Sequence, residues 1–177
     1  MADAMTEPSV TLEVAHPDQR ATLDNLVQLY THDFSELWAG LPRGEVDESG
    51  RFPPYPHLDL YWREEGRVPL LIRAGGALAG FALLNRHGHV APTVERNMAE
   101  FFVLRKHRRA GIGTAAMHAI LDRYPGLWET AIVRANSAAL GFWRKAISTH
   151  PRVRDLEEHD LNSSAWDGPV LCYRVIG

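Results

Sequence analysis

The sequence predicts a single domain of the α/β (α+β) class spanning residues 1–177. Two patterns indicate this class. Apolar runs at residues 68–74 and 77–84 are separated by a Gly-Gly pair, which is typical of a β-hairpin. Residues 111–124 then place apolar side chains three and four positions apart, as an amphipathic helix does. A chain of 177 residues is also the usual length of one domain.

The first third of the chain contains a strand, a helix and a long irregular stretch. Residues 1–9 are small and polar and are expected to be flexible, and residues 11–14 form a short strand candidate. Pro17 opens a helix that runs to about Tyr30. Residues 31–60 are rich in proline and carry an acidic patch. So long an irregular stretch inside one domain is typical of a binding loop or lid.

The rest of the chain alternates between strands and helices. A loop is expected at residues 86–97, directly after the hairpin. The elements expected beyond it are a strand at 99–104, the helix at 111–124, a strand at 128–133, a helix capped by Asn136 or Ser137, and a strand at 169–176.

The overall composition argues against several classes of protein. Hydrophobic residues make up 45% and charged residues 23%, with a net charge of −3, so nothing global favours nucleic acid or a membrane. Cys172 is the single cysteine and lies in an apolar run, which suits a core position in a reducing compartment. The pair His87 and His89 lacks a third ligand, so no metal site is expected. We expect a cytoplasmic protein.

The most informative segment runs from Glu100 to Thr114, where an apolar strand ends, basic side chains follow and two glycines open a helix. Gly111 and Gly113 allow the backbone to approach an anion closely. The first N–H groups of a helix lack helical partners and can bind phosphate oxygens. Arg105, Lys106, Arg108 and Arg109 add positive charge around that site.

Other interpretations of this segment remain open. A mononucleotide-binding loop needs a Lys-Ser/Thr pair after the second glycine, and Gly113 is followed by Thr-Ala. A dinucleotide site fits G-x-G-x-x-A at residues 111–116, with Glu129 downstream, but a basic linker separates these glycines from the strand. A helix start with a solvated basic face is a third alternative. A nucleic-acid patch is disfavoured because no stacking aromatic residues flank the segment.

The spacing Arg108-x-x-Gly111-x-Gly113 resembles the R/Q-x-x-G-x-G/A acetyl-CoA signature of the GNAT superfamily of N-acetyltransferases. A second element follows about 25 residues later, because Asn136-x-x-Ala139-x-x-Phe142-Trp143 resembles that superfamily's N-x-x-A-x-x-F-Y element. The resemblance covers residues 68–147. Glu100-Phe-Phe-Val also resembles a strand of the spermidine/spermine acetyltransferase branch, although this tetrapeptide says little about the substrate.

The resemblance implies a mixed, mostly antiparallel sheet between helices. In such a fold the strands at 99–104 and 128–133 are parallel and splay apart, and pantetheine lies between them. Residues 18–60 are expected to cover the acceptor side. The residues expected to bind acetyl-CoA are Phe102, Val103, Leu104, Arg108, Arg109, Ala110, Gly111, Ile112, Gly113, Thr114, Asn136, Ala139, Phe142 and Trp143.

One departure from the family pattern concerns the acid that protonates the leaving thiolate. Trp143 stands where the family usually has a tyrosine, and an indole N–H is no useful acid. The role is therefore vacant or filled elsewhere, with Tyr30, Tyr61 and Tyr173 as candidates. This departure keeps open a second function, that of a non-catalytic acyl-CoA sensor or binding module.

Glu100 is the candidate catalytic base. Attack on a thioester needs a neutral amine, and a lysine-like amine with a pKa of about 10.4 is protonated at pH 7. Glu100 lies in an otherwise apolar strand, near the expected thioester site. The alternative is that its side chain faces solvent or pairs with an arginine. Backbone N–H groups near Val103 and Leu104 are expected to hold the oxyanion.

The sequence therefore predicts an enzyme that transfers an acetyl group from acetyl-CoA to a primary amine of a small molecule or peptide by direct attack. Its expected partner is a small-molecule amine, with no nucleic acid and no membrane, and a homodimer is left open.

Overall fold

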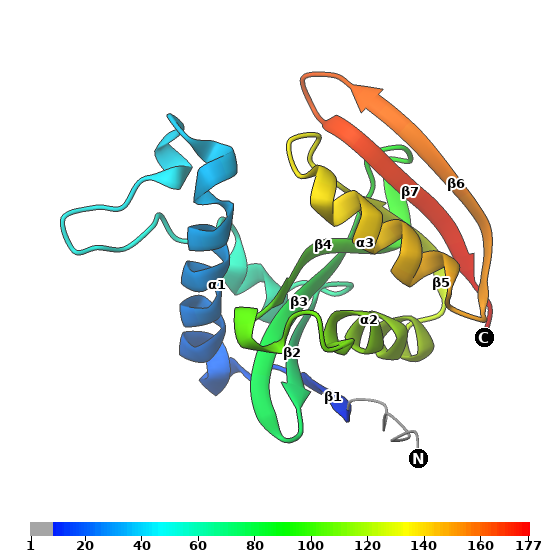
Figure 1. Ribbon diagram of the computed structural model, residues 1–177, viewed down its shortest axis with the longest axis horizontal. Helices are drawn as coiled ribbons and strands as arrows, with labels where there is room; N and C mark the ends of the chain where they lie inside the picture. The colour runs from blue at the N-terminus through cyan, green and yellow to red at the C-terminus, as the bar shows by residue number, and fades with distance from the viewer. Residues whose placement is uncertain (1–8) are drawn as a thin grey trace, which may run out of the picture.

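The computed structural model describes residues 9–177. The flexibility expected at the start of the chain thus concerns residues that, apart from Ser9, lie outside the described part. Seven strands form one sheet in the order β1-β2-β3-β4-β5-β7-β6 (Figure 1). The strands are β1 (Val10–Val14), β2 (Val68–Ala74), β3 (Ala77–His87), β4 (Thr93–Val103), β5 (Gly126–Ala131), β6 (Val153–Asn162) and β7 (Asp167–Val175). The helices are α1 (Arg20–Phe34), α2 (Ile112–Arg123) and α3 (Ser137–Ser148).

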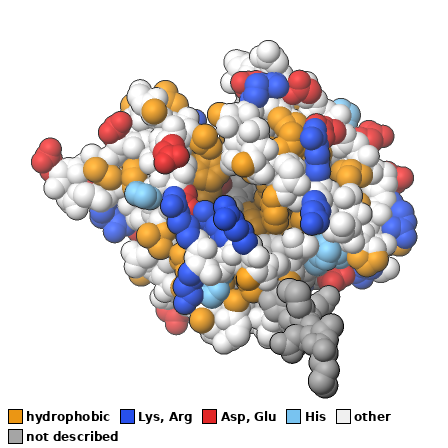
Figure 2. Space-filling view, in the orientation of Figure 1, with side chains coloured by type: hydrophobic (Ala, Val, Ile, Leu, Met, Phe, Trp, Pro, Cys, Tyr) orange, Lys and Arg blue, Asp and Glu red, His pale blue; other side chains and the backbone are white. Residues whose placement is uncertain are grey.

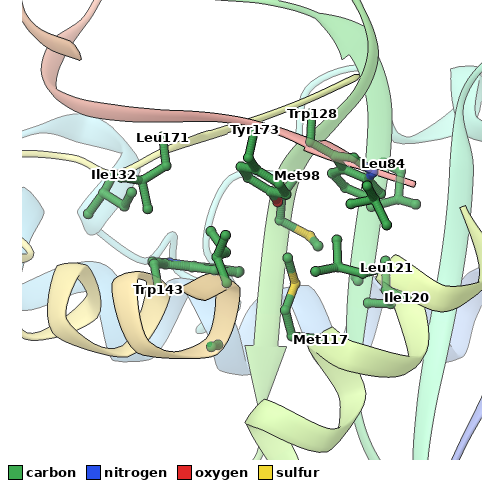
Figure 3. Close-up of a cluster of buried hydrophobic side chains, with 14 of the residues drawn as sticks. Leu84, Met98, Met117, Ile120, Leu121, Trp128, Ile132, Trp143, Leu171 and Tyr173 are labelled. Atoms are coloured by element: carbon green, nitrogen blue, oxygen red, sulfur yellow. The ribbon is translucent and has the colours of Figure 1, made fainter. Parts of the chain in front are cut away.

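The helices cover both faces of the sheet (Figure 1). α1 packs on one face, where Leu23 and Val27 join Phe81 in a buried cluster. α2 and α3 pack on the other face, over the larger cluster shown in Figure 3. Met117 of α2 and Trp143 of α3 contribute to that cluster. The larger cluster thus packs both helices on one face of the sheet.

The sheet is mostly antiparallel, and within the described strands only β4 and β5 pair in parallel. That pairing runs from Arg96 opposite Trp128 to Met98 opposite Thr130, and there it ends. Beyond it, β4 stays with β3 and β5 stays with β7. The predicted mixed sheet with a splayed parallel pair is therefore confirmed, with the divergence beginning at Ala99.

A β-bulge in β4 coincides with the divergence. Leu84 lies opposite Met98 and Leu83 lies opposite Glu100, so Ala99 is the extra residue. A bulge bends its strand and interrupts the alternation of side chains. Met98 and Phe101 consequently pack toward α2 and α3, while Glu100 is directed toward α1.

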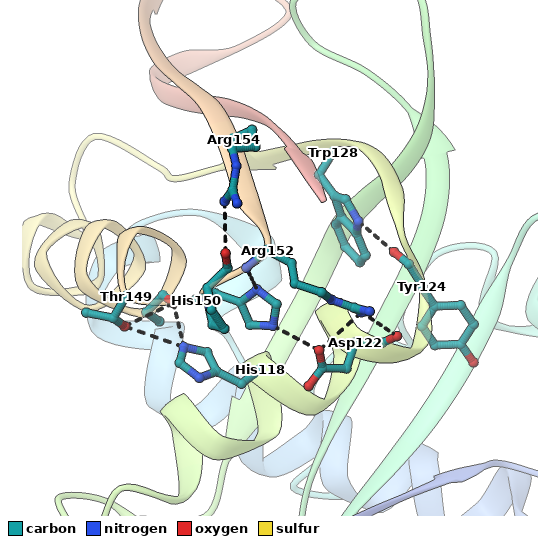
Figure 4. A network of polar contacts seen from close by, with 10 residues as sticks. His118, Asp122, Tyr124, Trp128, Thr149, His150, Arg152 and Arg154 are labelled. Atoms are coloured by element: carbon teal, nitrogen blue, oxygen red, sulfur yellow. Dashed lines mark hydrogen bonds and ion pairs between the residues drawn. The ribbon is translucent and has the colours of Figure 1, made fainter. Parts of the chain in front are cut away.

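A polar network ties α2 to the turn between α3 and β6 (Figure 4). Nε2 of His150 lies 3.2 Å from Oδ1 of Asp122, and Arg152 donates to the Asp122 carbonyl oxygen at 2.8 Å. Nε2 of His118 lies 2.8 Å from the Ala146 carbonyl oxygen. Burial lowers the pKa of His150 despite its carboxylate partner. This network lies away from the divergent strands and serves the fold.

Two expectations about the sheet are wrong. The loop expected at 86–97 is mostly strand, because β3 continues to His87 and β4 begins at Thr93. Asn85 of β3 and Asn97 of β4 form a buried polar pair, in which Asn97 Nδ2 donates to Asn85 Oδ1 at 2.9 Å. Because these buried positions are polar, hydropathy does not identify this part of the sheet as strand. β6 was not expected at all, since this edge strand is mostly exposed and carries charges on both faces.

Within residues 9–177, no helix has both the length and the apolar character needed to cross a membrane.

Candidate active site

The start of α2 has the backbone conformation that an anion site requires. Gly111 caps the helix with φ +78°, and Arg109 also has a positive φ of 62°. The first helical bond is donated by Ala115 to the Gly111 carbonyl oxygen at 2.9 Å. The N–H groups of Ile112, Gly113 and Thr114 precede that bond and have no partner within the helix. They form a donor cluster at the positive end of the helix dipole.

A cavity of about 540 Å³, the glycine pocket, opens beside this helix start. Its walls come from α1, the end of β4, the basic loop, α2 and α3. The lining residues are Asp33, Phe34, Phe101, Phe102, Val103, Arg108, Arg109, Gly111, Gly113, Thr114, Ala139 and Phe142. Figure 2 shows basic side chains beside a hollow with hydrophobic walls. The pocket therefore joins an apolar wall to a cationic rim.

Gly113 faces α3 at close range. A Cβ at this position would lie 3.2 Å from Cε2 of Phe142, which itself lines the glycine pocket. Phe142 stacks on Phe101, with ring centroids 5.9 Å apart. A side chain larger than hydrogen at position 113 would thus enter the space between α2 and α3.

Arg108 is held in place by α1. Its guanidinium donates to Asp33, and its Nε donates to the Val103 carbonyl oxygen at 2.7 Å. Arg105 binds the same carboxylate at 2.9 Å. Burial opposes ionisation of Asp33, but the hydrogen bonds from Arg108 and Arg105 hold its pKa below the usual value. Asp33 therefore anchors the basic loop at the mouth of the pocket.

A second cavity, the strand cleft, lies where β4 and β5 part. It has a volume of about 210 Å³ and is bordered by Met98, Phe101, Ile132, Asn136 and Trp143, among others. Asn136 caps α3, and its side chain accepts a bond from the Ala139 N–H at 3.3 Å.

The backbone of β4 offers one of the two N–H groups expected there. Leu104 donates to the Ala79 carbonyl oxygen at 2.8 Å, so the expectation that its N–H is exposed at the strand end is wrong. Antiparallel pairing alternates in direction, and Val103 therefore turns its N–H away from β3, toward the space that β5 has left. Val103 is thus the backbone donor at this position.

Glu100 has two tyrosine partners. Tyr30 of α1 donates to one carboxylate oxygen, and Tyr55 donates to the other at 3.0 Å. Burial raises the pKa of Glu100 to about 7, although both hydrogen bonds act in the opposite direction. The alternative of a solvent-facing or arginine-paired Glu100 is wrong for this structure. A carboxyl with such a pKa can accept or release a proton near neutral pH.

The tyrosine pocket, a third cavity of about 660 Å³, lies on the α1 side of Glu100. Its walls come from α1, the segment between residues 38 and 57, Arg67 just before β2, the end of β3 and Glu100 of β4. The lining residues are Tyr30, Thr31, Trp38, Arg43, Pro53, Pro54, Tyr55, Pro56, His57, Arg67, Asn85, His87 and Glu100. The long irregular stretch is thus a wall of a cavity.

The three cavities form a continuous row. The glycine pocket shares Phe34, Phe101 and Ala139 with the strand cleft. The strand cleft in turn shares Tyr30, Trp38, Arg43 and Glu100 with the tyrosine pocket. Glu100 therefore lies at the junction between the cleft and the tyrosine pocket.

Comparison with family models matches residues 23–147 to the acetyltransferase (GNAT) family. The chain belongs to this family. A comparison with curated protein sequences finds no significant match.

Solved GNAT structures share the fold. An acetyltransferase of the GNAT family from Staphylococcus aureus Mu50 has 13% identity and a TM-score of 0.60, with 96% of this chain and 100% of that chain covered. The aminoglycoside acetyltransferase AAC(6')-Ib in complex with coenzyme A has 16% identity and a TM-score of 0.62, covering 94% and 95%. A spermidine N-acetyltransferase chimera including the Vibrio cholerae protein has 11% identity and a TM-score of 0.54, covering 94% and 95%.

Most residues singled out from the GNAT motifs border the row of cavities. Leu104, Ala110 and Ile112 do not line it, and the Ile112 side chain is buried in a small core cluster. Of the tyrosines considered as acids, only Tyr30 lines a cavity; Tyr173 is buried, with its hydroxyl 3.0 Å from Thr130 Oγ1.

Sequence reasoning missed Asp33, Phe101 and Tyr55 as parts of the site. Asp33 and Tyr55 contact Arg105 and Glu100, residues that lie at least 45 positions away in the sequence, so no local sequence pattern reveals these contacts. Phe101 could have been found, because it is the apolar neighbour of Glu100 in a motif already recognised.

Proposed function

We propose that this protein transfers an acetyl group from acetyl-CoA to a primary amine of a small molecule or peptide. The observation that carries the proposal is the position of Glu100. It lies where the strand cleft meets the tyrosine pocket, with a pKa raised by burial to about 7. A base at this junction can reach an amine that enters from the tyrosine pocket.

The glycine pocket fits the phosphate end of acetyl-CoA. The unpaired N–H groups at the start of α2 suit pyrophosphate oxygens, and Arg109 lies on the rim. Gly113 leaves open the space that a Cβ would fill against Phe142. Phe101 and Ala139 provide an apolar wall that continues into the strand cleft. Acetyl-CoA would supply the acetyl thioester there.

The chain's own groups then serve the transfer. Glu100 takes a proton from the amine, whose nitrogen becomes nucleophilic once neutral. The Val103 N–H, directed into the gap, stabilises negative charge on the carbonyl oxygen. Tyr30 borders both the cleft and the pocket and donates to Glu100, so it can give its proton to the leaving sulfur while its oxygen takes from Glu100 the proton that came from the amine. Phe142 in the glycine pocket and Trp143 in the strand cleft add apolar surface that disfavours water.

The first test is ligand specificity in thermal unfolding. CoA and acetyl-CoA should raise the Tm, while NAD and ATP at equal concentration should not. At a hundredfold excess over Kd, the added stability should be about 2.7 kcal/mol. The reason is that the donor cluster and the apolar cleft together match a phosphorylated pantetheine.

Preferential stabilisation by NAD would contradict the proposal. Release of free CoA thiol with a panel of amines distinguishes an enzyme from an acyl-CoA sensor. A sensor would bind acetyl-CoA and release no thiol beyond the rate seen without amine.

A further inference from the structure

The charged side chains of the tyrosine pocket are mostly cationic. Arg43 and Arg67 line it, and among the described residues the only carboxylate on the lining is Glu100. A pocket built for a polycation would present several carboxylates. The positive charge of the pocket therefore disfavours a polycationic substrate.

Glu100 offsets only part of this charge. Both of its oxygens already accept hydrogen bonds, from Tyr30 and Tyr55. Burial also raises its pKa to about 7, so near neutrality the carboxyl is protonated in part of the molecules. It serves as a proton acceptor for one amine, and it cannot neutralise a second positive charge.

Arg43 is a cation without a carboxylate partner among residues 9–177. Its guanidinium lies over the ring of Trp38, 4.5 Å from the centroid, and this contact orients it. Arg43 lines both the tyrosine pocket and the strand cleft, as Glu100 does. An anionic group bound by Arg43 would thus lie close to the reacting amine.

Further hydrogen-bond donors surround the same space. Nε1 of Trp38 is buried and has no partner in the described chain, although Trp38 lines the pocket. Arg67, which also lines the pocket, has a side chain that is 13% exposed; its Nη2 lies 3.1 Å from Nε2 of His87, and Glu64 is its ion-pair partner. Two guanidinium groups and an indole N–H thus belong to the residues that line the pocket.

The acidic patch in residues 45–48 is placed elsewhere. Glu45 and Asp47 border a separate surface hollow, outside the tyrosine pocket. The Asp47 side chain stabilises the turn that it belongs to, because its Oδ1 accepts hydrogen bonds from the Ser49 N–H at 2.8 Å and the Arg51 N–H at 3.1 Å. The patch does not supply the negative charge that a polycationic acceptor would need.

We propose that the acceptor is an amine that also carries a carboxylate, as an amino acid or a short peptide does. Arg43 binds the carboxylate at the junction with the strand cleft, and the apolar body packs on Pro53, Pro54 and Tyr55. This inference rests on the proposed function, since it assigns the substrate class of the same site.

The test compares matched ligands by calorimetry on the full chain, with and without CoA. The pairs are L-phenylalanine with its amide and glycyl-L-phenylalanine with its amide, and spermidine is the polycation. The carboxylates should bind about tenfold more tightly than their amides, which is the worth of one charge-assisted hydrogen bond. Spermidine should bind more weakly than either carboxylate.

Arg43→Gln should remove the difference between carboxylate and amide. Arg86→Gln is the matched control, because Arg86 lies on β3 next to lining residues but is itself outside the pocket. It should keep the full preference.

Three results would overturn the inference: equal or tighter binding of amides or spermidine, no binding by any ligand, or a carboxylate preference that survives Arg43→Gln. Release of free CoA thiol from acetyl-CoA, measured on the same preparations, tests the proposed acetyltransferase function independently of the substrate class. Acetylation of spermidine in preference to the amino acids would agree with the proposed acetyltransferase function and would refute the proposal that the acceptor carries a carboxylate.

Discussion

In the proposed mechanism, Glu100 is the residue on which the chemistry depends. Its two tyrosine partners hold the carboxyl at a fixed place, and burial raises its pKa to about 7. The deprotonated form is the proposed base. We therefore expect kcat/KM to rise with pH as Glu100 ionises and to be lost below neutrality.

Glu100→Gln should lower kcat by about 10²–10⁴-fold at neutral pH. The amide keeps the shape and can still bond with Tyr30 and Tyr55, but it accepts no proton. CoA affinity should stay nearly intact, and activity should partly return at high pH as the amine deprotonates itself. Steady-state kinetics across pH 6–10 would measure this. Near-normal kcat with an unchanged pH profile would rule out Glu100 as the base.

Tyr30→Phe should shift the acidic limb of the pH profile of kcat/KM to higher pH. The Tyr30 hydrogen bond lowers the pKa of Glu100, so its loss raises that pKa. A hydrogen bond to a charged group is worth about 1.5 kcal/mol or more, which corresponds to about one pH unit. The phenyl ring retains the packing against Phe81 and Phe102.

Tyr61→Phe is the control for this variant. The Tyr61 hydroxyl is buried and makes no hydrogen bond in the described chain, and the two hydrogen bonds that lower the pKa of Glu100 come from Tyr30 and Tyr55. Its removal should leave the acidic limb in place. An equal displacement in both variants, or none in Tyr30→Phe, would show that the Tyr30 hydroxyl does not tune Glu100.

At the scale of elements, the strand–loop–helix unit from β4 to α2 could be predicted because its signals are local. The glycines and the apolar spacing lie within the fourteen residues from 101 to 114 and in α2 itself. The bulge at Ala99 could not be predicted, since it depends on the register with β3. That bulge decides which face Glu100 occupies. β6 was missed because an exposed edge strand needs no apolar alternation.

Gly113→Val should weaken CoA binding by more than tenfold while the protein still folds. The Cβ would lie 3.2 Å from the Phe142 ring, and the branched methyl groups would take up space in the glycine pocket, where the proposal places the phosphates. Gly141→Val is the matched control, because a Cβ at Gly141 of α3 has no neighbour within 4 Å. Calorimetry with CoA and the Tm of each variant separate binding from stability. Unchanged CoA affinity in Gly113→Val would place the phosphates elsewhere.

At the scale of the whole molecule, the sheet consists of two parts. β1 to β4 form one part, and β5, β7 and β6 form the other. Only three residue pairs join them, from Arg96 and Trp128 to Met98 and Thr130. The row of cavities begins where this pairing ends, and both parts contribute walls, α2 from one side and α3 from the other. A ligand in the row therefore contacts both parts at once.

This arrangement predicts that CoA slows amide hydrogen exchange on both sides of the gap. Protection should increase at the start of α2, at the end of β4 and in the first turn of α3 together, because opening any of them releases the ligand. At a hundredfold excess over Kd, such openings become about 100-fold rarer. The edge strand β6 borders no part of the row and should exchange as before. In Gly113→Val the added protection should disappear from all three segments. Protection confined to α2 would contradict a ligand that bridges the two parts of the sheet.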